Sequence, residues 1–543
     1  MNTPDKSSMM ERSTTVRFCR WLFSWRGLRR LLILLAWFVT LVALFYGEET
    51  WRGRHAWNQY RRQLEARGEQ LDFAALVPKP VPDEQNFAAT PFVKSWFEKK
   101  TAYDSDHPWN DPYSRVARRV QFPSKPKDAR YERRFEDLVA WQTAFAAVRS
   151  GELTPQQRFY SAKLDAASRA QAAPAVLEGL KTNEALFAEL RVAGQRPYSR
   201  YPVNYDLEML FSIRRPHLQM VKGVCQRLQL KACAELAGGQ SGPALEDLEL
   251  MFRLTDSLKT DPFLISYLVR IACGQVATQP IWEGLAEHRW SDAQLQELET
   301  RLQQYNFIAD LKAPLAAEQA GSIAMMELVR KKGLGYVLAL NAAGRPEATA
   351  AAADAKKLNF IGSVIVPRGW YYLEELNLCR GFHVELATAL DNNKQRVSPA
   401  QVKADTQAFE QMMAPPGFAR TTPGTILGHR VMARLLLPAL GRVILRSATA
   451  QTAFNQAAIA CALERYRLAN GHFPEALAAL APRFISPLPD DVLTGEPYKY
   501  RLRDDGQFVL YSVGWDEKDD GGVPGKTLFD DQQGDWVWEY PAK

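Results

Sequence analysis

The sequence predicts a mainly α-helical protein with an N-terminal transmembrane helix, stacked helical hairpins and a small C-terminal α+β domain. Three observations lead to this fold class: an uncharged apolar run near the N-terminus, amphipathic helical patterns through the middle, and alternating strand-like segments near the C-terminus. With 543 residues the chain is longer than one compact core normally supports, so we expect several folded units. The expected divisions are a cytoplasmic basic tail (1–29), a transmembrane signal-anchor (30–47), a juxtamembrane connector (48–120), a helical domain (121–440) and a C-terminal domain (441–543).

The apolar run from Leu31 to Gly47 predicts the transmembrane helix. Its 17 residues carry no charge, which is at the short end of what crosses a bilayer. Leu28 and the arginines before it can extend the span by snorkelling, and Trp37 and Tyr46 suit the aromatic belt of a membrane interface. A cleaved signal peptide is the alternative, but no small-residue cleavage pattern follows the run, so an uncleaved anchor is favoured.

The charges around this run predict its orientation. Residues 1–30 hold seven Lys or Arg residues and two acidic residues, a balance of +5, whereas Glu48 and Glu49 follow the run directly. The positive-inside rule leaves the N-terminus in the cytoplasm and places the bulk of the chain outside it, in the periplasm. We therefore expect a single-pass protein of the cytoplasmic (inner) membrane that contacts the lipid bilayer through residues 30–47.

The charge distribution also argues against a nucleic-acid partner. The whole chain has a net charge of +7 and the tail supplies +5 of it, which leaves +2 for the other 513 residues. The basic stretch between Arg115 and Arg134 is interleaved with Asp128 and Glu132, as is typical of a solvated helical face. No nucleic-acid partner is therefore expected.

The six cysteines form no C-x-x-C pair and no metal-like cluster. Cys225, Cys233, Cys273 and Cys461 lie in apolar helical patterns, where a buried free thiol is the usual state. An exported domain permits disulfides, so a bond between Cys225 and Cys233 stays open as the alternative.

The connector begins with a short helix, expected at 57–67 and separate from the anchor. The stretch VPKPVPDEQNFAATP (77–91) follows, and its four prolines favour extended chain because proline and the residue before it are poorly compatible with a helix.

Turn and cap signals divide the middle of the chain into helices. Asp261 before Pro262 predicts a helix N-cap, and Ser291 with Gln294 predicts a capping box. Residues 230–254 resemble a tetratricopeptide-type helical hairpin, with small residues, a glycine turn and a second helix. Three copies at a fixed period are missing, so the sequence predicts stacked hairpins without strict repeats.

The C-terminal region changes to a mixed pattern. A helix is expected to end at Gly471, and PYKYRLR and QFVLYSV flank the turn signal 504–506, which predicts a β-hairpin. WVWEY (536–540) predicts a further strand. Since this region has its own helix, hairpin and turns, we expect residues 448–543 to fold when expressed alone.

An ordered run of motifs lies in residues 448–525. The motifs are Y-x-x-x-N-G-x-[FY]-P, then L…LP-x-D-x-x-x-G-x-P-Y-x-Y, then YS-x-G-x-D, carried here by Tyr466, Asn470, Gly471, Phe473, Pro474, Leu488, Pro489, Asp491, Gly495, Pro497, Tyr498, Tyr500, Tyr511, Ser512, Gly514 and Asp516. This run resembles the globular domain of the major pseudopilins of type II secretion, which implies a pseudopilin-like fold for the C-terminal domain.

The chain departs from the pseudopilin pattern at its N-terminus. A pseudopilin has a peptidase-cut leader and a glutamate at the fifth position of its hydrophobic helix, whereas the apolar run here contains no acidic residue. We therefore do not expect the chain to be processed or polymerised as a pilin subunit. The segment VPRGWYYLEELNL (366–378) also resembles uncharacterised single-pass bacterial envelope proteins.

The pseudopilin resemblance implies a calcium site in the loop after the hairpin, where members of that family bind calcium. In WDEKDDGG (515–522), Asp516, Asp519 and Asp520 offer the hard oxygen ligands that calcium prefers. The alternative is a solvated acidic turn.

No sequence motif for catalysis is present: the chain lacks H-E-x-x-H, a Walker A loop, G-x-G-x-x-G after a strand, and G-x-S-x-G.

The sequence favours a non-enzymatic extracytoplasmic protein that presents binding surfaces to another envelope protein. Fold analogy associates it with a secretion or pilus-type machine. One alternative is an envelope hydrolase, which requires a deep cleft with two close, perturbed carboxylates. The other is a structural spacer, which requires no concave or apolar surface.

Overall fold

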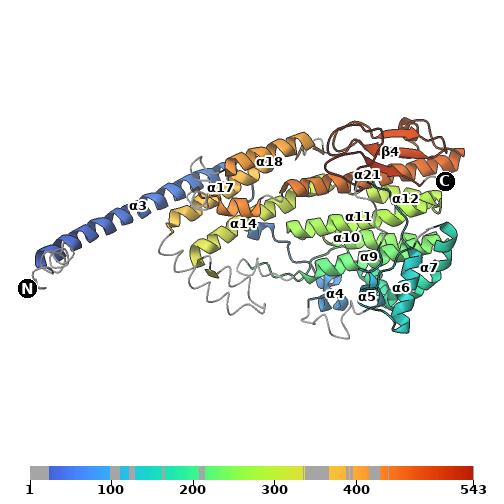
Figure 1. Ribbon diagram of the computed structural model, residues 1–543, viewed down its shortest axis with the longest axis horizontal. Coiled ribbons are helices and arrows are strands. Elements are labelled where there is room, and N and C mark those ends of the chain that lie inside the picture. Colours follow the sequence, from blue (N-terminus) through green and yellow to red (C-terminus); the bar gives the residue numbers. More distant parts are fainter. Residues whose placement is uncertain are drawn as a thin grey trace, which may run out of the picture. The chain divides into compact units, whose positions relative to one another are not determined.

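A computed structural model of the chain confirms the helical fold class, with a small antiparallel sheet near the C-terminus (Figure 1). The structure describes residues 24–97, 111–121, 129–161, 165–206, 215–333, 335–336, 366–386, 390–391, 395–414, 428–437 and 440–541. Cys19 and most of the basic tail lie outside these ranges.

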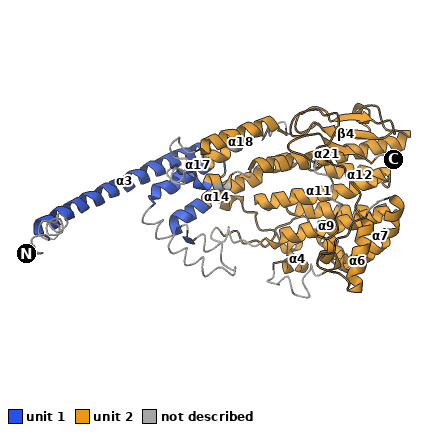
Figure 2. Cartoon of the chain, viewed as in Figure 1, with its two compact units in different colours: residues 1–69, 325–378, 415–432 blue, residues 70–324, 379–414, 433–543 orange. Residues whose placement is uncertain are grey.

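The chain forms two compact units (Figure 2). Unit 1 contains residues 1–69, 325–378 and 415–432, and unit 2 contains residues 70–324, 379–414 and 433–543. The helices α14 (Lys312–Lys332) and α17 (Arg368–Leu386) each begin in one unit and end in the other.

Unit 1 is built on α3 (Trp25–Ala66), a single helix of 42 residues that starts at an N-cap formed by Ser24. The separate short helix expected at 57–67 is wrong, because no proline lies between Gly47 and Ala66 and the helix continues through this stretch. In the part of the chain that the structure describes, α3 is the one helix long and apolar enough to cross a membrane. Its apolar side chains are exposed, for example Leu34 at 65% and Leu44 at 64%.

The far part of α3 contacts the start of α17 at a pair of glycines. A Cβ atom added to Gly53 would lie 2.3 Å from the carbonyl oxygen of Gly369, so only glycine permits this backbone approach. Trp370 donates a hydrogen bond of 3.2 Å from its indole nitrogen to Glu49, which also forms two hydrogen bonds with Arg52. This contact ties the segment 366–378 to the helix that carries the apolar run.

Unit 2 is a layered array of helices. Its main helices are α6 (Leu138–Ser150), α7 (Ala166–Leu180), α8 (Glu184–Gly194), α9 (Pro216–Ala237), α10 (Ser241–Ser257), α11 (Leu264–Ala286), α12 (Asp292–Gln303), α18 (Pro399–Met413) and α21 (Leu440–Asn470). Shorter helices and turns are α4 (Pro91–Ser95), α5 (Pro112–Val116), α13 (Phe307–Asp310), α20 (Val431–Leu436, which begins in unit 1), η1 (Phe73–Leu76), η2 (Asp83–Gln85), η3 (Phe87–Ala89), η4 (Lys181–Asn183) and η6 (Leu477–Leu480). Helices close in sequence pack together: α6 on α7, α7 on α9, α9 on α10 and α11, and α10 on α11 (Figure 1).

The predicted hairpin at 230–254 is present, since α9 ends at Ala237 and α10 begins at Ser241. The capping box of Ser291 and Gln294 is confirmed at the start of α12. The predicted cap at Asp261 is wrong, because α11 begins at Leu264 after Phe263 and the carboxylate of Asp261 turns toward other partners.

The C-terminal sheet has the order β3-β4-β5, with β3 (Lys499–Leu502), β4 (Phe508–Ser512) and β5 (Trp536–Glu539) all antiparallel to their neighbours. The predicted hairpin is confirmed, with Leu502 opposite Phe508 and Gly506 at a φ of 76° in the turn. A second, two-stranded sheet joins β1 (Leu390–Asp391) to β2 (Arg396–Val397).

The C-terminal helix α21 shares its core with the helical array, because it packs against α11, α12 and α13. The sheet is tied to the array as well. Trp282 of α11 donates a hydrogen bond of 2.9 Å to the carbonyl oxygen of Glu539, and the backbone N–H of Tyr131 donates one of 2.7 Å to Gly525. The C-terminal elements and the helices therefore bury one another.

Candidate binding groove

The three carboxylates of the predicted calcium site lie in the loop after β4, but the structure does not gather them. Asp516 accepts a hydrogen bond of 3.3 Å from a nearby backbone N–H. Asp519 accepts one of 3.1 Å from the hydroxyl of Tyr511, and the backbone N–H of Asp520 donates to Asp535 at 3.3 Å. Over the residues that the structure describes, no group of three His, Cys, Asp or Glu side chains is arranged to hold a metal ion.

The most deeply buried acid between β4 and β5 is Asp535, which sequence reasoning did not single out. Its carboxylate accepts a hydrogen bond of 2.6 Å from the backbone N–H of Gly522. Burial, together with the charges of Asp519 and Asp520, raises the pKa of Asp535 to about 6. The geometry as it stands does not fit calcium, and calcium binding stays a prediction from the resemblance.

The calcium prediction has a direct test in the full chain. If calcium binds the folded loop, millimolar calcium should raise the melting temperature by about 2–4 °C relative to chelator, because a ligand specific for the folded state stabilises it. The shift should vanish in a variant with Asp519→Ala and Asp520→Ala. Identical melting curves with calcium and with chelator would establish a solvated acidic turn instead.

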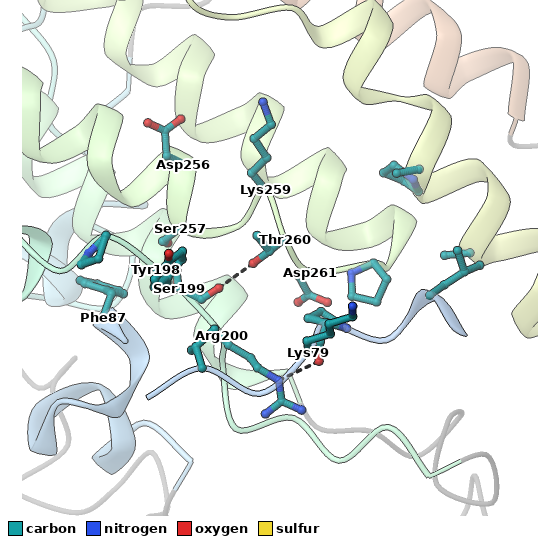
Figure 3. A pocket seen from close by; sticks show the side chains of 18 of the residues that line it. Lys79, Phe87, Tyr198, Ser199, Arg200, Asp256, Ser257, Lys259, Thr260 and Asp261 are labelled. Carbon is teal, nitrogen blue, oxygen red and sulfur yellow. Dashed lines mark hydrogen bonds between the residues drawn. The ribbon is translucent and has the colours of Figure 1, made fainter. Parts of the chain in front are cut away.

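The more developed site is a groove of about 560 Å³ in unit 2 (Figure 3). Four segments form it: the stretch 76–87, residues 197–200, the link 253–262 between α10 and α11, and the first turns of α14 at 313–317. Its walls are largely apolar, with Leu76, Val81, Pro197, Pro262, Pro314 and Ala317 among the lining side chains.

Hydrogen bonds hold the four segments together. Residues 77–82 contain three prolines and run extended, and Arg200 donates a hydrogen bond of 2.9 Å to the carbonyl oxygen of Pro78 (Figure 3). The hydroxyl of Thr260 donates one of 2.6 Å to the carbonyl oxygen of Ser199. The backbone of Tyr198 pairs with the stretch 85–87, while its side chain stays 51% exposed at the groove.

A buried polar cluster lies under the groove, around Asp261. One oxygen of its carboxylate accepts a hydrogen bond of 2.8 Å from the hydroxyl of Ser266 and one of 3.0 Å from the ring of His217. His217 is fully buried and stacks on Tyr201 with a ring separation of 4.2 Å. Because Ser266 donates its proton to the carboxylate and not to histidine, this arrangement does not activate a nucleophile. The cluster supports the groove wall.

A second cavity of about 660 Å³ lies between residues 303–308, α21 and residues 487–495. Side-chain amides line it, but they bind the protein itself. Gln451 donates hydrogen bonds to the carbonyl oxygen of Tyr305 at 3.2 Å and to Asn455 at 2.9 Å, and accepts one of 2.7 Å from the backbone of Phe307. The amide of Gln451 is therefore engaged within the protein and is not free to bind a ligand in this cavity.

Burial raises the pKa of Asp491, which lines the second cavity, and three other carboxylates with raised pKa values lie away from both cavities. Burial raises the pKa of Glu136 to about 7 and the pKa values of Glu235 and Glu375 to about 8. None of the three lines either cavity. The second cavity thus has a carboxylate with a raised pKa, Asp491, beside the carboxylate of Asp490, whereas the groove has no such pair, so the hydrolase alternative stays open at the second cavity alone.

The pKa of Glu136 leads to a prediction for stability against pH. Its folded-state pKa of about 7 lies above the ordinary value of 4.5, so the folded state holds this proton more tightly than the unfolded chain. The contribution of Glu136 to the free energy of unfolding is therefore most favourable below pH 4.5. As the pH rises toward 7, roughly 3 kcal/mol of that free energy is lost at most. Glu136→Gln should flatten this part of the stability profile, measured by denaturant unfolding, because glutamine does not titrate. Glu132→Gln, at an exposed side chain, should leave the profile unchanged. An unaltered slope in Glu136→Gln would contradict the assignment.

Comparisons with protein-family models, with curated proteins and with solved structures give no match for this chain. Sequence reasoning missed the groove, because its four segments are far apart in the chain and the prolines were the only local signal.

Proposed function

We propose that residues 30–47 anchor the protein in the cytoplasmic membrane, with the N-terminus in the cytoplasm and the rest of the chain outside. The exposed apolar side chains of α3 support the anchor, since they gain a favourable environment in hydrocarbon. The basic tail before the run, and Glu48 and Glu49 after it, support the orientation. The groove of unit 2 then opens to the periplasm.

On this anchor the chain acts as a non-enzymatic binding protein whose groove holds an extended segment of another envelope protein. The observation that carries this proposal is the cavity of about 560 Å³ with apolar walls. Cavities of this size with largely apolar walls are typical ligand sites. A structural spacer needs no such concave surface, and a hydrolase needs reactive groups that the groove does not offer.

The shape and lining of the groove favour an extended segment as the occupant. Two of its walls, residues 77–82 and 197–200, are themselves extended chain. The exposed ring of Tyr198 stands beside them, and tyrosine is enriched among the residues that dominate binding energy at protein interfaces.

The C-terminal elements support a place near a secretion or pilus-type machine. A long helix, α21, followed by the antiparallel strands β3 to β5 is the order that the pseudopilin resemblance implies. This link rests on fold analogy, so the partner is expected among envelope proteins of such a machine.

Site-specific photo-cross-linking in intact membranes tests the binding role. A photoreactive amino acid in place of Tyr198 should give a discrete adduct with another protein, identified by mass spectrometry. The matched control replaces Tyr160, which is also tyrosine and 60% exposed but does not line the groove. Ala313→Phe, at an exposed position of the groove, should abolish the adduct by filling the cavity. No adduct at Tyr198, or the same adduct from Tyr160, would refute the proposed role.

A further inference from the structure

The groove carries more positive than negative charge. Four cationic side chains line it, Lys79, Arg200, Arg253 and Lys259, against the carboxylates of Asp256 and Asp261. This local excess of +2 equals the net charge of the whole chain outside residues 1–30. Outside residues 1–30 and the groove, the positive and negative charges of the chain balance.

Three of these cations have no carboxylate partner among the described residues. Lys79 is exposed and takes part in none of the ion pairs found there. Arg200 and Arg253 are held by backbone carbonyl oxygens, of Pro78 for the first and of residues 194 and 196 for the second. A carbonyl oxygen positions a guanidinium group but carries no net charge to neutralise it. Lys259 differs, since it pairs with Asp310 at 3.2 Å.

The two carboxylates of the groove are already engaged. Asp256 pairs with Arg301. Asp261 is only 5% exposed, and one oxygen of its carboxylate accepts hydrogen bonds from Ser266 and His217. Neither acid therefore neutralises the three unpaired cations.

We infer that the groove is specific for an acidic peptide, an extended apolar segment with Asp or Glu side chains, and this inference rests on the proposed peptide-binding function. The carboxylates of such a segment would meet Lys79, Arg200 and Arg253, while its apolar residues cover the walls. A guanidinium group matches a carboxylate in geometry, and lysine adds a compact charge at the rim. An anionic lipid would satisfy the same cations, but walls of extended chain favour a peptide, so lipid is an outcome of the test.

The test uses the full chain in nanodiscs of phosphatidylcholine with three fluorescent hexapeptides. All three alternate Leu and Pro with a third residue, which is Glu, Gln or Lys. At low salt the Glu peptide should bind about tenfold more tightly than the Gln peptide, and the Lys peptide should bind weakest. The difference should shrink in about 0.5 M NaCl, where surface charges are screened.

Two charge-reversal variants assign the effect to the groove. Lys79→Glu should weaken binding of the Glu peptide by about fivefold or more while leaving the Gln peptide bound, which shows that the protein is folded. Lys181→Glu, at a side chain that is 72% exposed and outside the groove, should change neither affinity.

The outcomes separate the two proposals. Equal binding of the Glu and Gln peptides would overturn the acidic specificity and leave peptide binding intact. Binding of none of the peptides would overturn both. Displacement of the Glu peptide by vesicles that contain phosphatidylglycerol, but not by vesicles of phosphatidylcholine alone, would replace the peptide by an anionic lipid.

Discussion

Arg169→Met is expected to lower the free energy of unfolding by about 3–5 kcal/mol, one of the largest effects of any single substitution in unit 2. The guanidinium group of Arg169 on α7 is 1% exposed and pairs with Glu283 on α11 and with Glu287, the C-cap of that helix. Glu283 is equally buried. Removing the cation leaves this carboxylate in an apolar interior without its partner, and that uncompensated charge accounts for the cost.

Denaturant unfolding of the full chain measures this effect. The matched control is Lys181→Met, which removes an ion pair with Glu178 in which both side chains are exposed, and it should cost less than about 1 kcal/mol. Adding Glu283→Gln to Arg169→Met should restore part of the loss, because the unpaired charge is removed. Equal effects of Arg169→Met and Lys181→Met would contradict the buried pair.

The second large effect concerns residues 448–543, which we expect not to fold alone. The ring of Phe454 on α21 is fully buried and lies 4.9 Å from that of Tyr305, 5.0 Å from that of Phe307 and 6.3 Å from that of Phe252. All three partners belong to the helical array. An isolated C-terminal segment would expose this aromatic core, and the lost burial amounts to several kcal/mol.

An amide NMR spectrum and a thermal melt of the purified segment measure this outcome. We expect collapsed amide dispersion and no cooperative transition for residues 448–543, and a cooperative transition for residues 70–543, which retain the partners of α21. A dispersed spectrum from the short segment would restore the sequence-based expectation that it folds alone. The structure argues against that expectation because the apolar face of α21 is completed by α11, α12 and α13.

Signals that act over a few residues were predicted from the sequence. The capping box at Ser291 forms because its hydroxyl and the amide of Gln294, three positions along, satisfy backbone groups within one turn. Gly471 ends α21 with a φ of 84°, a left-handed conformation that glycine adopts without strain. Gly506 likewise adopts a left-handed conformation, with a φ of 76°, in the turn of the hairpin between β3 and β4. Each of these signals is complete within a short stretch of chain.

Features that depend on distant residues were not predictable in this way. The sequence around Asp261 matches an N-cap, but its carboxylate instead binds His217, which is 44 positions away in the chain. Arg169 and Glu283 are 114 positions apart and carry no local signal of their pairing. The groove likewise needs segments from residue 76 to residue 317. Tertiary packing, and not local propensity, decides all three.

The proposed function depends most on the membrane topology, with the N-terminus in the cytoplasm and the groove in the periplasm. A fusion of alkaline phosphatase to the C-terminus tests this, because the enzyme is active only outside the cytoplasm. The basic balance of +5 in residues 1–30 and the apolar run after it predict an active fusion, beside a silent fusion to a reporter that works only in the cytoplasm. An inactive phosphatase together with an active cytoplasmic reporter would contradict the topology and remove the periplasmic partner from the proposed function.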